Sequence, residues 1–157
     1  MLLRTAVVAT IVLAPALGLA QAVPAALDAC ALLHEADALA LLPGTKQVTQ
    51  APSSTRADDR ESSACVYTDA ANATRTVALS IQRFPATVPS DVGLALFNDY
   101  ELVPVDGVGN GALWKPSTGT LIMVSDPDFI TLTVNRTDTP ATMEEVRKVM
   151  KRVYARR

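Results

Sequence analysis

Hydrophobic positions in this chain follow the two-residue period of β-strands through its middle and a helical period towards its ends. Every second residue from 77 to 81 is apolar, which is the pattern of a strand with one buried face. Residues 129–136 alternate in the same way. Residues 121–124 form an unbroken apolar run, which predicts a central strand covered on both faces.

Shorter strand signals, bounded by turn residues, lie at 45–51, 64–69, 102–105, 112–115 and 120–125. The turn at 70–73 predicts a hairpin between 64–69 and 74–82, and the later Gly- and Pro-containing turns predict a meander. The segment 53–63 is predicted as an exposed loop, because its apolar residues are no larger than alanine.

Helix signals surround these strands. Asp28 can cap a short turn that reaches Leu33, and residues 35–42 show helical spacing before Pro43-Gly44. Another helix is predicted at 90–98.

The last helix carries the clearest helical pattern. Thr139 is its predicted cap and Pro140 its first residue. Its apolar arc consists of Met143, Val146, Val149, Met150, Val153 and Tyr154. The whole pattern predicts an α+β fold, in which an antiparallel sheet of about five to six strands is flanked by N-terminal and C-terminal helices.

The first twenty residues have the pattern of a secretory signal peptide. Arg4 precedes an apolar run, and Gly18 and Ala20 supply the small residues that predict cleavage after Ala20. The run is too short to span a bilayer core of about 30 Å, so we expect a periplasmic or secreted protein with no transmembrane segment in the mature chain. Gln21 follows the cut, so no lipid anchor is expected. Residues 21–157 are expected to form a single domain.

Charge argues against one class of partner. Arg4 is the only charged residue of the leader, so the mature chain has 13 Lys and Arg against 16 Asp and Glu. A mildly acidic protein is a poor polyanion binder, and we expect no nucleic-acid partner.

Two cysteines, Cys30 and Cys65, remain after the predicted cleavage. In an oxidising compartment an isolated pair most simply forms one disulfide, which would tie the N-terminal helix to the strand at 64–69. The alternative is a redox or metal site. A C-x-x-C motif is absent and His34 is the only histidine, so the sequence favours the structural bond.

Several short sequence motifs of this chain resemble those of a known family. They are residues 28–33 (DACALL), the Cys-x-Tyr at 65–67, the segment 105–114 (VDGVGNGALW), two further strands and a final helix. Together they resemble exported bacterial envelope proteins of a domain-of-unknown-function family, best known from actinobacterial lipoproteins. The resemblance implies an α+β sandwich of the PsbP and Mog1 type, and it carries over no catalytic residue. Gln21 stands here where many members have a lipidated cysteine.

Candidate chemistry is sparse. A lone His34 cannot share a metal with a second imidazole, and we expect it at a helix start. Asp58, Asp59 and Glu61 lack the spacing of a calcium loop, and the acidic residues at 126 and 128 suit a turn. We predict no catalytic residue, no cofactor and no metal.

Trp114 follows a glycine-rich turn that contains Gly107 and Gly109. These three residues could border a ligand or partner surface. The alternative for Trp114 is that it fills the core or its rim, and the glycines are then turn residues.

These observations favour a non-enzymatic binding or accessory protein of the envelope, whose partner is an unknown protein or small molecule. A protein-directed inhibitor or immunity factor is the alternative. A hydrolase is the third, and it would need a serine, an aspartate and His34 brought together by the fold.

Overall fold

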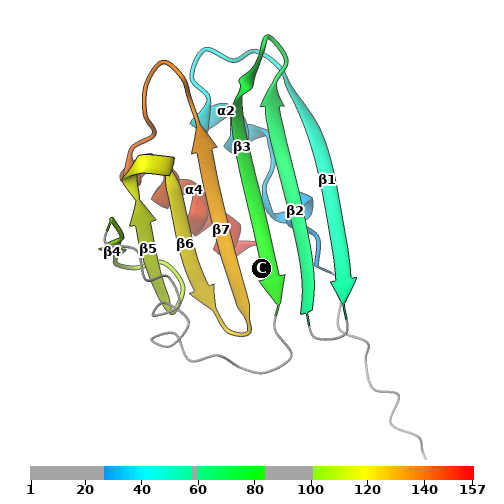
Figure 1. Ribbon diagram of the computed structural model, residues 1–157, viewed down its shortest axis with the longest axis vertical. Helices are drawn as coiled ribbons and strands as arrows, with labels where there is room; N and C mark the ends of the chain where they lie inside the picture. Colours follow the sequence, from blue (N-terminus) through cyan, green and yellow to red (C-terminus); the bar gives the residue numbers. More distant parts are fainter. Residues whose placement is uncertain (1–26, 58–59, 84–100) are drawn as a thin grey trace, which may run out of the picture.

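Seven antiparallel strands form one sheet, and three helices lie on one of its faces (Figure 1). This computed structural model describes residues 27–57, 60–83 and 101–157. The strands are β1 (Val48–Ala57), β2 (Arg60–Asp69), β3 (Asn72–Arg83), β4 (Val103–Val105), β5 (Gly111–Lys115), β6 (Thr120–Ser125) and β7 (Asp128–Asn135). The helices are α1 (Ala29–Leu32), α2 (Glu35–Leu41) and α4 (Met143–Ala155), with a 3-10 turn η1 (Pro116–Thr118).

The sheet consists of two meanders joined side by side. Its strand order is β1-β2-β3-β7-β6-β5-β4. The junction is the pairing of β3 with β7, in which Leu79 lies opposite Leu132. The α+β class and the antiparallel sheet between N-terminal and C-terminal helices are as predicted. The strands described number seven rather than five to six.

One face of the sheet packs against the helices and forms the core. Because side chains alternate along a strand, paired residues on neighbouring strands share a face. The buried residues of this helix-covered face include Cys65, Tyr67, Val77, Leu79, Ile81, Ala112, Trp114, Leu121, Met123, Ile130, Leu132 and Val134. All six residues of β6 are buried, which confirms the prediction of a central strand covered on both faces.

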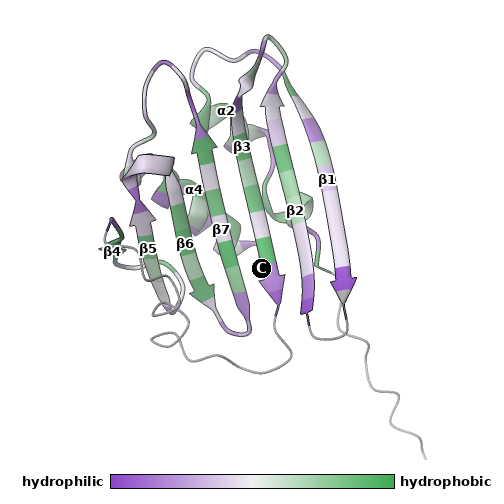
Figure 2. Ribbon diagram, viewed as in Figure 1, coloured by the Kyte–Doolittle hydropathy of each residue, from purple (hydrophilic) through white to green (hydrophobic). Residues whose placement is uncertain are grey.

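The opposite face of β1, β2, β3 and β7 is called the open face here. Its residues include Thr49, Ala51, Ser53, Thr55, Arg60, Ser62, Ala64, Val66, Thr68, Thr76, Ala78, Ser80, Gln82, Phe129, Thr131, Thr133 and Asn135. All of these except Arg60 are uncharged, and all except the buried Phe129 are at least partly exposed. Figure 2 shows how hydropathy falls from the green central strands towards the pale edge strand β1.

The segment 53–63, predicted as an exposed loop, is instead the end of β1 and the start of β2. Ser54 pairs with Ser63, and Arg56 pairs with Glu61. The prediction was wrong because it took large apolar residues as the sign of a strand. An edge strand that is exposed on both faces does not need them. Backbone pairing with β2 holds β1 in place. Asp58 and Asp59 lie outside the described residues, as do the leader and the helix predicted at 90–98.

Helix α4 begins later than predicted. Thr142, not Thr139, is its N-cap, and Pro140 precedes the helix. The hydroxyl of Thr142 accepts from Glu145 N, and the Glu145 carboxylate accepts from Thr142 N at 2.8 Å. This reciprocal capping box satisfies two backbone donors, which a cap at Thr139 would not do, since its third following residue is a threonine. Of the predicted apolar arc, Val146, Val149, Met150 and Val153 are buried and Met143 is half-buried, whereas Tyr154 is 43 % exposed.

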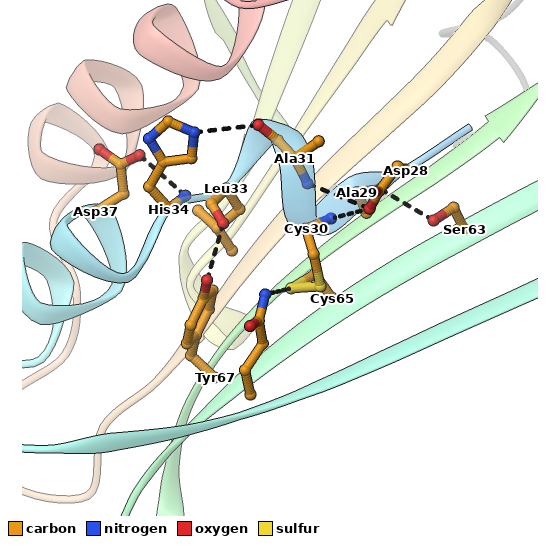
Figure 3. Close-up of a disulfide and its surroundings, with 11 residues drawn as sticks. Asp28, Ala29, Cys30, Ala31, Leu33, His34, Asp37, Ser63, Cys65 and Tyr67 are labelled. Atoms are coloured by element: carbon orange, nitrogen blue, oxygen red, sulfur yellow. Dashed lines mark hydrogen bonds between the residues drawn. A yellow bond between two sulfur atoms is a disulfide. The ribbon is translucent and has the colours of Figure 1, made fainter. Parts of the chain in front are cut away.

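A disulfide between Cys30 and Cys65 fastens α1 to β2, as predicted (Figure 3). Asp28 caps α1 by accepting from the backbone N–H groups of Cys30 and Ala31. Ser63 accepts from Ala29 N at 3.0 Å, and the Tyr67 hydroxyl donates to Leu33 O at 3.1 Å. Strand β2 therefore holds the N-terminal helices by one covalent bond and by hydrogen bonds on both sides of it.

Candidate functional site

Polar loops gather at one end of the sheet, which is the upper end in Figure 1. We call it the polar end, and it comprises the α2–β1 loop (43–47), the β2–β3 turn with the start of β3 (69–75), η1 with Gly119, and the β7–α4 loop (136–142). Antiparallel pairing brings these segments together, because β2 and β7 end where β3 begins. Two hollows lie here.

The first hollow, called the threonine hollow, has a volume of about 590 Å³. It is lined by Thr74, Pro116, Ser117, Thr118, Gly119, Val134, Asn135, Arg136, Thr137, Pro140 and Ala141. Gly119 closes the turn after η1 with φ of 60°, and a Cβ at this position would lie 2.6 Å from Val134 O. Only glycine fits both the left-handed backbone and this close approach. The residues that line this hollow make its wall rich in hydroxyl and amide groups.

Arg136 contributes a buried cation to this wall. Its side chain is 2 % exposed, and Nη2 donates to Glu145 Oε2 at 2.7 Å. The backbone N–H of Thr142 and the guanidinium of Arg136 lower the pKa of Glu145 to about 2. Glu145 is therefore ionised at neutral pH, and the pair links the end of β7 to the first turn of α4.

The second hollow, called the Lys46–Arg75 hollow, has a volume of about 550 Å³. It is lined by Gly44, Thr45, Lys46, Gln47, Asp69, Ala70, Ala71, Asn72 and Arg75. Asp69 is 6 % exposed and accepts from the Thr45 hydroxyl at 2.7 Å and from Ala71 N at 2.9 Å. The hydrogen bond from Thr45 has the largest effect on the pKa of Asp69, and the bond from Ala71 the next largest. Both lower this pKa, so the carboxylate is ionised at neutral pH.

Arg75 follows Thr74 on β3, so consecutive residues of this strand line the two hollows. Thr74 lines the threonine hollow, and the next residue lines the other. Arg75 Nε is 3.9 Å from Asp138 Oδ1 in the β7–α4 loop, and Nη2 donates to Pro43 O at 2.7 Å. The side chain of Arg75 thus connects the α2–β1 loop with the β7–α4 loop.

The residues that the sequence singled out lie elsewhere. Trp114 is 5 % exposed and pairs with Leu121 on the helix-covered face. Its burial fits the core-filling alternative. Gly107 and Gly109 lie in a turn near the opposite end of the sheet, and a Cβ on Gly109 would meet Met123 Cγ at 2.6 Å. A ligand surface formed by these three residues stays a prediction.

Asn110, next to that turn, lines a hollow of about 540 Å³ with Ser125, Asp126, Tyr154 and Arg157. Arg157 donates to the backbone oxygen of Ser125 at 2.6 Å, and Asn110 donates to Asp126 Oδ2 at 3.1 Å. The polar groups of this hollow therefore bond largely to one another.

His34 is the N-cap residue of α2, so it lies at a helix start as expected (Figure 3). Its Nε2 lies 3.1 Å from Ala31 O, and its backbone N–H donates to Asp37 Oδ2 at 3.4 Å. Asp37 is itself bound by Arg152 and Arg156. A triad of a serine, an aspartate and His34, which the hydrolase hypothesis needs, stays a prediction.

Within residues 27–57, 60–83 and 101–157, no group of three or more His, Cys, Asp and Glu side chains could hold a metal ion. No helix in these ranges is long and apolar enough to cross a membrane.

Sequence reasoning missed the polar end. Its residues come from four segments between 43 and 142, most of them in turns, and a turn's composition does not show which other turn lies beside it. The signal that could have drawn attention is the run of polar residues that flanks Arg136 after an otherwise buried strand.

Comparison with known proteins finds no matching family model, no matching curated protein and no matching solved structure. The family resemblance therefore stays a prediction.

Proposed function

We propose that this protein is an exported, non-enzymatic binding protein of the bacterial envelope, which holds its ligand at the polar end of the sheet. The observation that carries the proposal is the pair of hollows at this end of the sheet, each of more than 500 Å³. Small-molecule sites are usually concave, measure several hundred Å³ and have a mainly apolar lining with a few placed polar groups. These hollows have that size, and their lining contains more polar residues, which suits a polar ligand. The disulfide supports an oxidising compartment outside the cytoplasm.

Binding, rather than catalysis, suits the charged groups at this end. A general acid or base works best when its pKa lies near the operating pH. Asp69 and Glu145 instead have lowered pKa values, because each is held by hydrogen bonds to its ionised form. Asp69 is a fixed hydrogen-bond acceptor in the Lys46–Arg75 hollow at neutral pH, and Glu145 holds Arg136 in the wall of the threonine hollow. This arrangement orients a ligand better than it moves a proton.

Native mass spectrometry of the protein purified gently from its own envelope tests this proposal. We expect a bound small molecule that is absent after denaturation and refolding. Thr137→Tyr should fill the threonine hollow and reduce the bound fraction at least about fivefold. Thr49→Tyr, an exposed change on β1, is the matched control and should keep the ligand. Equal occupancy in both variants, or no ligand in the unaltered protein, would contradict a site at this end.

The open face favours the second candidate, a protein-directed inhibitor or immunity factor. This broad face spans four strands and carries one charged residue among those described, Arg60 at the start of β2, so it has few of the charges that usually keep a sheet surface solvated. In a cross-linking pull-down from the envelope, Ala78→Glu should then abolish capture of a protein partner, whereas Lys148→Glu on α4 should not. Capture that survives Ala78→Glu would argue against this candidate.

A further inference from the structure

Arg75 is a well-buried cation that makes very few hydrogen bonds. Its side chain is 14 % exposed, and of its donors only Nη2 makes a hydrogen bond, to Pro43 O. Nε is buried without a hydrogen-bond partner, as is Nε of Arg136 and of Arg147, but those two arginines each have a close carboxylate. Asp69 lies 3.8 Å from Nη1 and Asp138 lies 3.9 Å from Nε, so both carboxylates attract Arg75 from beyond hydrogen-bond distance.

Other arginines that are at least half buried are bonded more closely. Carboxylate oxygens lie at 2.7–2.9 Å from Arg83, Arg136, Arg147, Arg152 and Arg157, and Arg156 also contacts a carboxylate closely. A buried guanidinium normally has this kind of close, charge-assisted bond. Arg75 therefore keeps hydrogen-bonding capacity that the described part of the chain leaves unused.

Neither neighbouring carboxylate is placed to supply the missing bonds. Asp69 already accepts from Thr45 at 2.7 Å and from Ala71 at 2.9 Å, which fixes its orientation away from a close fork with Arg75. Asp138 is 55 % exposed on the β7–α4 loop. Lys46, a second cation, is exposed and lines the same hollow as Arg75.

We propose that the Lys46–Arg75 hollow is a subsite for an oxyanion, a carboxylate or phosphate group carried by the ligand. Because Nε is buried, such an anion would meet the N–H groups of Nη1 and the second hydrogen of Nη2, which can match two of its oxygens, and the Lys46 ammonium adds a flexible second contact. This inference rests on the proposed binding function, because it assigns the chemistry of one part of the polar end.

The charges of the hollow set the expected selectivity. Asp69 and Asp138 balance Lys46 and Arg75, so no strong positive field attracts anions in general. Recognition depends on the fork of donors, and oxyanions should bind in preference to chloride. An isolated ion should bind with a dissociation constant on the order of millimolar, because it has few contacts outside this subsite.

A ¹H–¹⁵N NMR titration of the disulfide-bonded protein tests the subsite. Sodium phosphate and sodium acetate are added in separate series, with sodium chloride at matched ionic strength as reference. We expect saturable shifts of the amides in 44–47 and 69–75 and of the Arg75 Nε–H resonance. The series that saturates identifies phosphate or carboxylate as the preferred group. Saturation in neither series, or equal shifts with chloride, would overturn the proposal.

Variants separate the subsite from surface charge. Lys46→Gln should weaken binding at least about threefold, and Arg75→Lys should remove the preference over chloride because it keeps the charge and loses the fork. Arg56→Gln is the control, since Arg56 is 65 % exposed at the far end of β1. If Arg75→Lys does not fold, Lys46→Gln alone decides. Unchanged affinity in Lys46→Gln, or equal losses in it and Arg56→Gln, would contradict the subsite.

The outcomes also distinguish this inference from the proposed function. A native ligand found by mass spectrometry, together with no oxyanion binding, would overturn the subsite and leave the binding function standing. Saturable oxyanion binding in a protein that carries no native ligand would support the subsite and count against the wider proposal.

Discussion

Asp37 in the first turn of α2 accepts a hydrogen bond from Arg152 Nε of α4 at 2.7 Å, across 115 positions of sequence. The Asp37 carboxylate is 3 % exposed, and Arg156 also bonds to it while donating to Leu32 O at 2.8 Å. Burial acts most strongly on Asp37 and opposes its ionisation, yet the bonds from Arg156 and Arg152 leave its pKa below the usual value. This cluster fastens the N-terminal helices to the last helix.

Replacing Asp37 should therefore destabilise the whole fold. Asp37→Ala removes a buried acceptor and leaves two arginines without their carboxylate, which should cost about 2–4 kcal/mol in the free energy of unfolding. Urea denaturation followed by circular dichroism measures this. Glu144→Ala, which removes a surface pair with Arg147, is the control and should cost about 0.5 kcal/mol or less. Equal losses would show that the cluster does not anchor α2.

Acid should weaken the junction between β7 and α4. The pKa of Glu145 falls from 4.5 to about 2 on folding, so its contribution is complete above about pH 4.5 and is lost as the pH falls towards 2. Because the side chain is 43 % exposed, solvent screening limits this contribution to about 1 kcal/mol. Melting temperatures measured from pH 6 to pH 2.5 should fall less steeply in Glu145→Gln. Parallel curves would contradict the assignment.

The disulfide should carry a large share of stability. Cys30 and Cys65 are 35 positions apart, and replacing both with serine should lower the free energy of unfolding by about 2–5 kcal/mol. Guanidinium denaturation of the variant and of the oxidised protein measures the difference. Two free thiols in the exported protein, detected by peptide mapping, would contradict the bond itself.

The two sides of α4 should respond differently to substitution. Val149 is 2 % exposed, and Val149→Asp would place an unpaired charge in the core at a cost of about 3–5 kcal/mol. Lys148 is exposed, and Lys148→Ala should change stability by about 0.5 kcal/mol or less. Thermal melts compare them. Similar shifts in melting temperature would mean that α4 is not docked through its apolar arc.

His34 and Trp114 allow a test of function. If the protein is a binding module, His34→Ala should leave its activity in the envelope unchanged, because its ring lies at the start of α2 and bonds to the Ala31 carbonyl rather than to a catalytic partner. Trp114→Ala should destabilise the fold by about 3–5 kcal/mol, since the side chain is buried. Loss of activity in a folded His34→Ala variant would instead favour the hydrolase hypothesis.

Local pattern alone predicted several elements correctly. The period of the residues after Met143 identifies a helix with one buried arc, and the alternation before and after residues 70–73 identifies the β2–β3 hairpin. The isolated pair of cysteines was enough to predict the disulfide. The helix and the hairpin depend on residues that are close together in the sequence, and two cysteines can pair in only one way. Composition and spacing are therefore enough to predict them.

Other features depend on what lies beside a segment in space. The polar stretch that ends β1 is a strand only because β2 offers backbone partners, and Thr142 caps α4 because Glu145 can return the bond. The pairing of β3 with β7 joins segments that are about fifty residues apart, and it alone brings Thr74 beside Arg136. The sequence by itself thus determined the types of most elements and their shared core. Tertiary structure decided which turns meet, because the free energy of long-range pairing depends on the whole chain, and so it decided where the polar end lies.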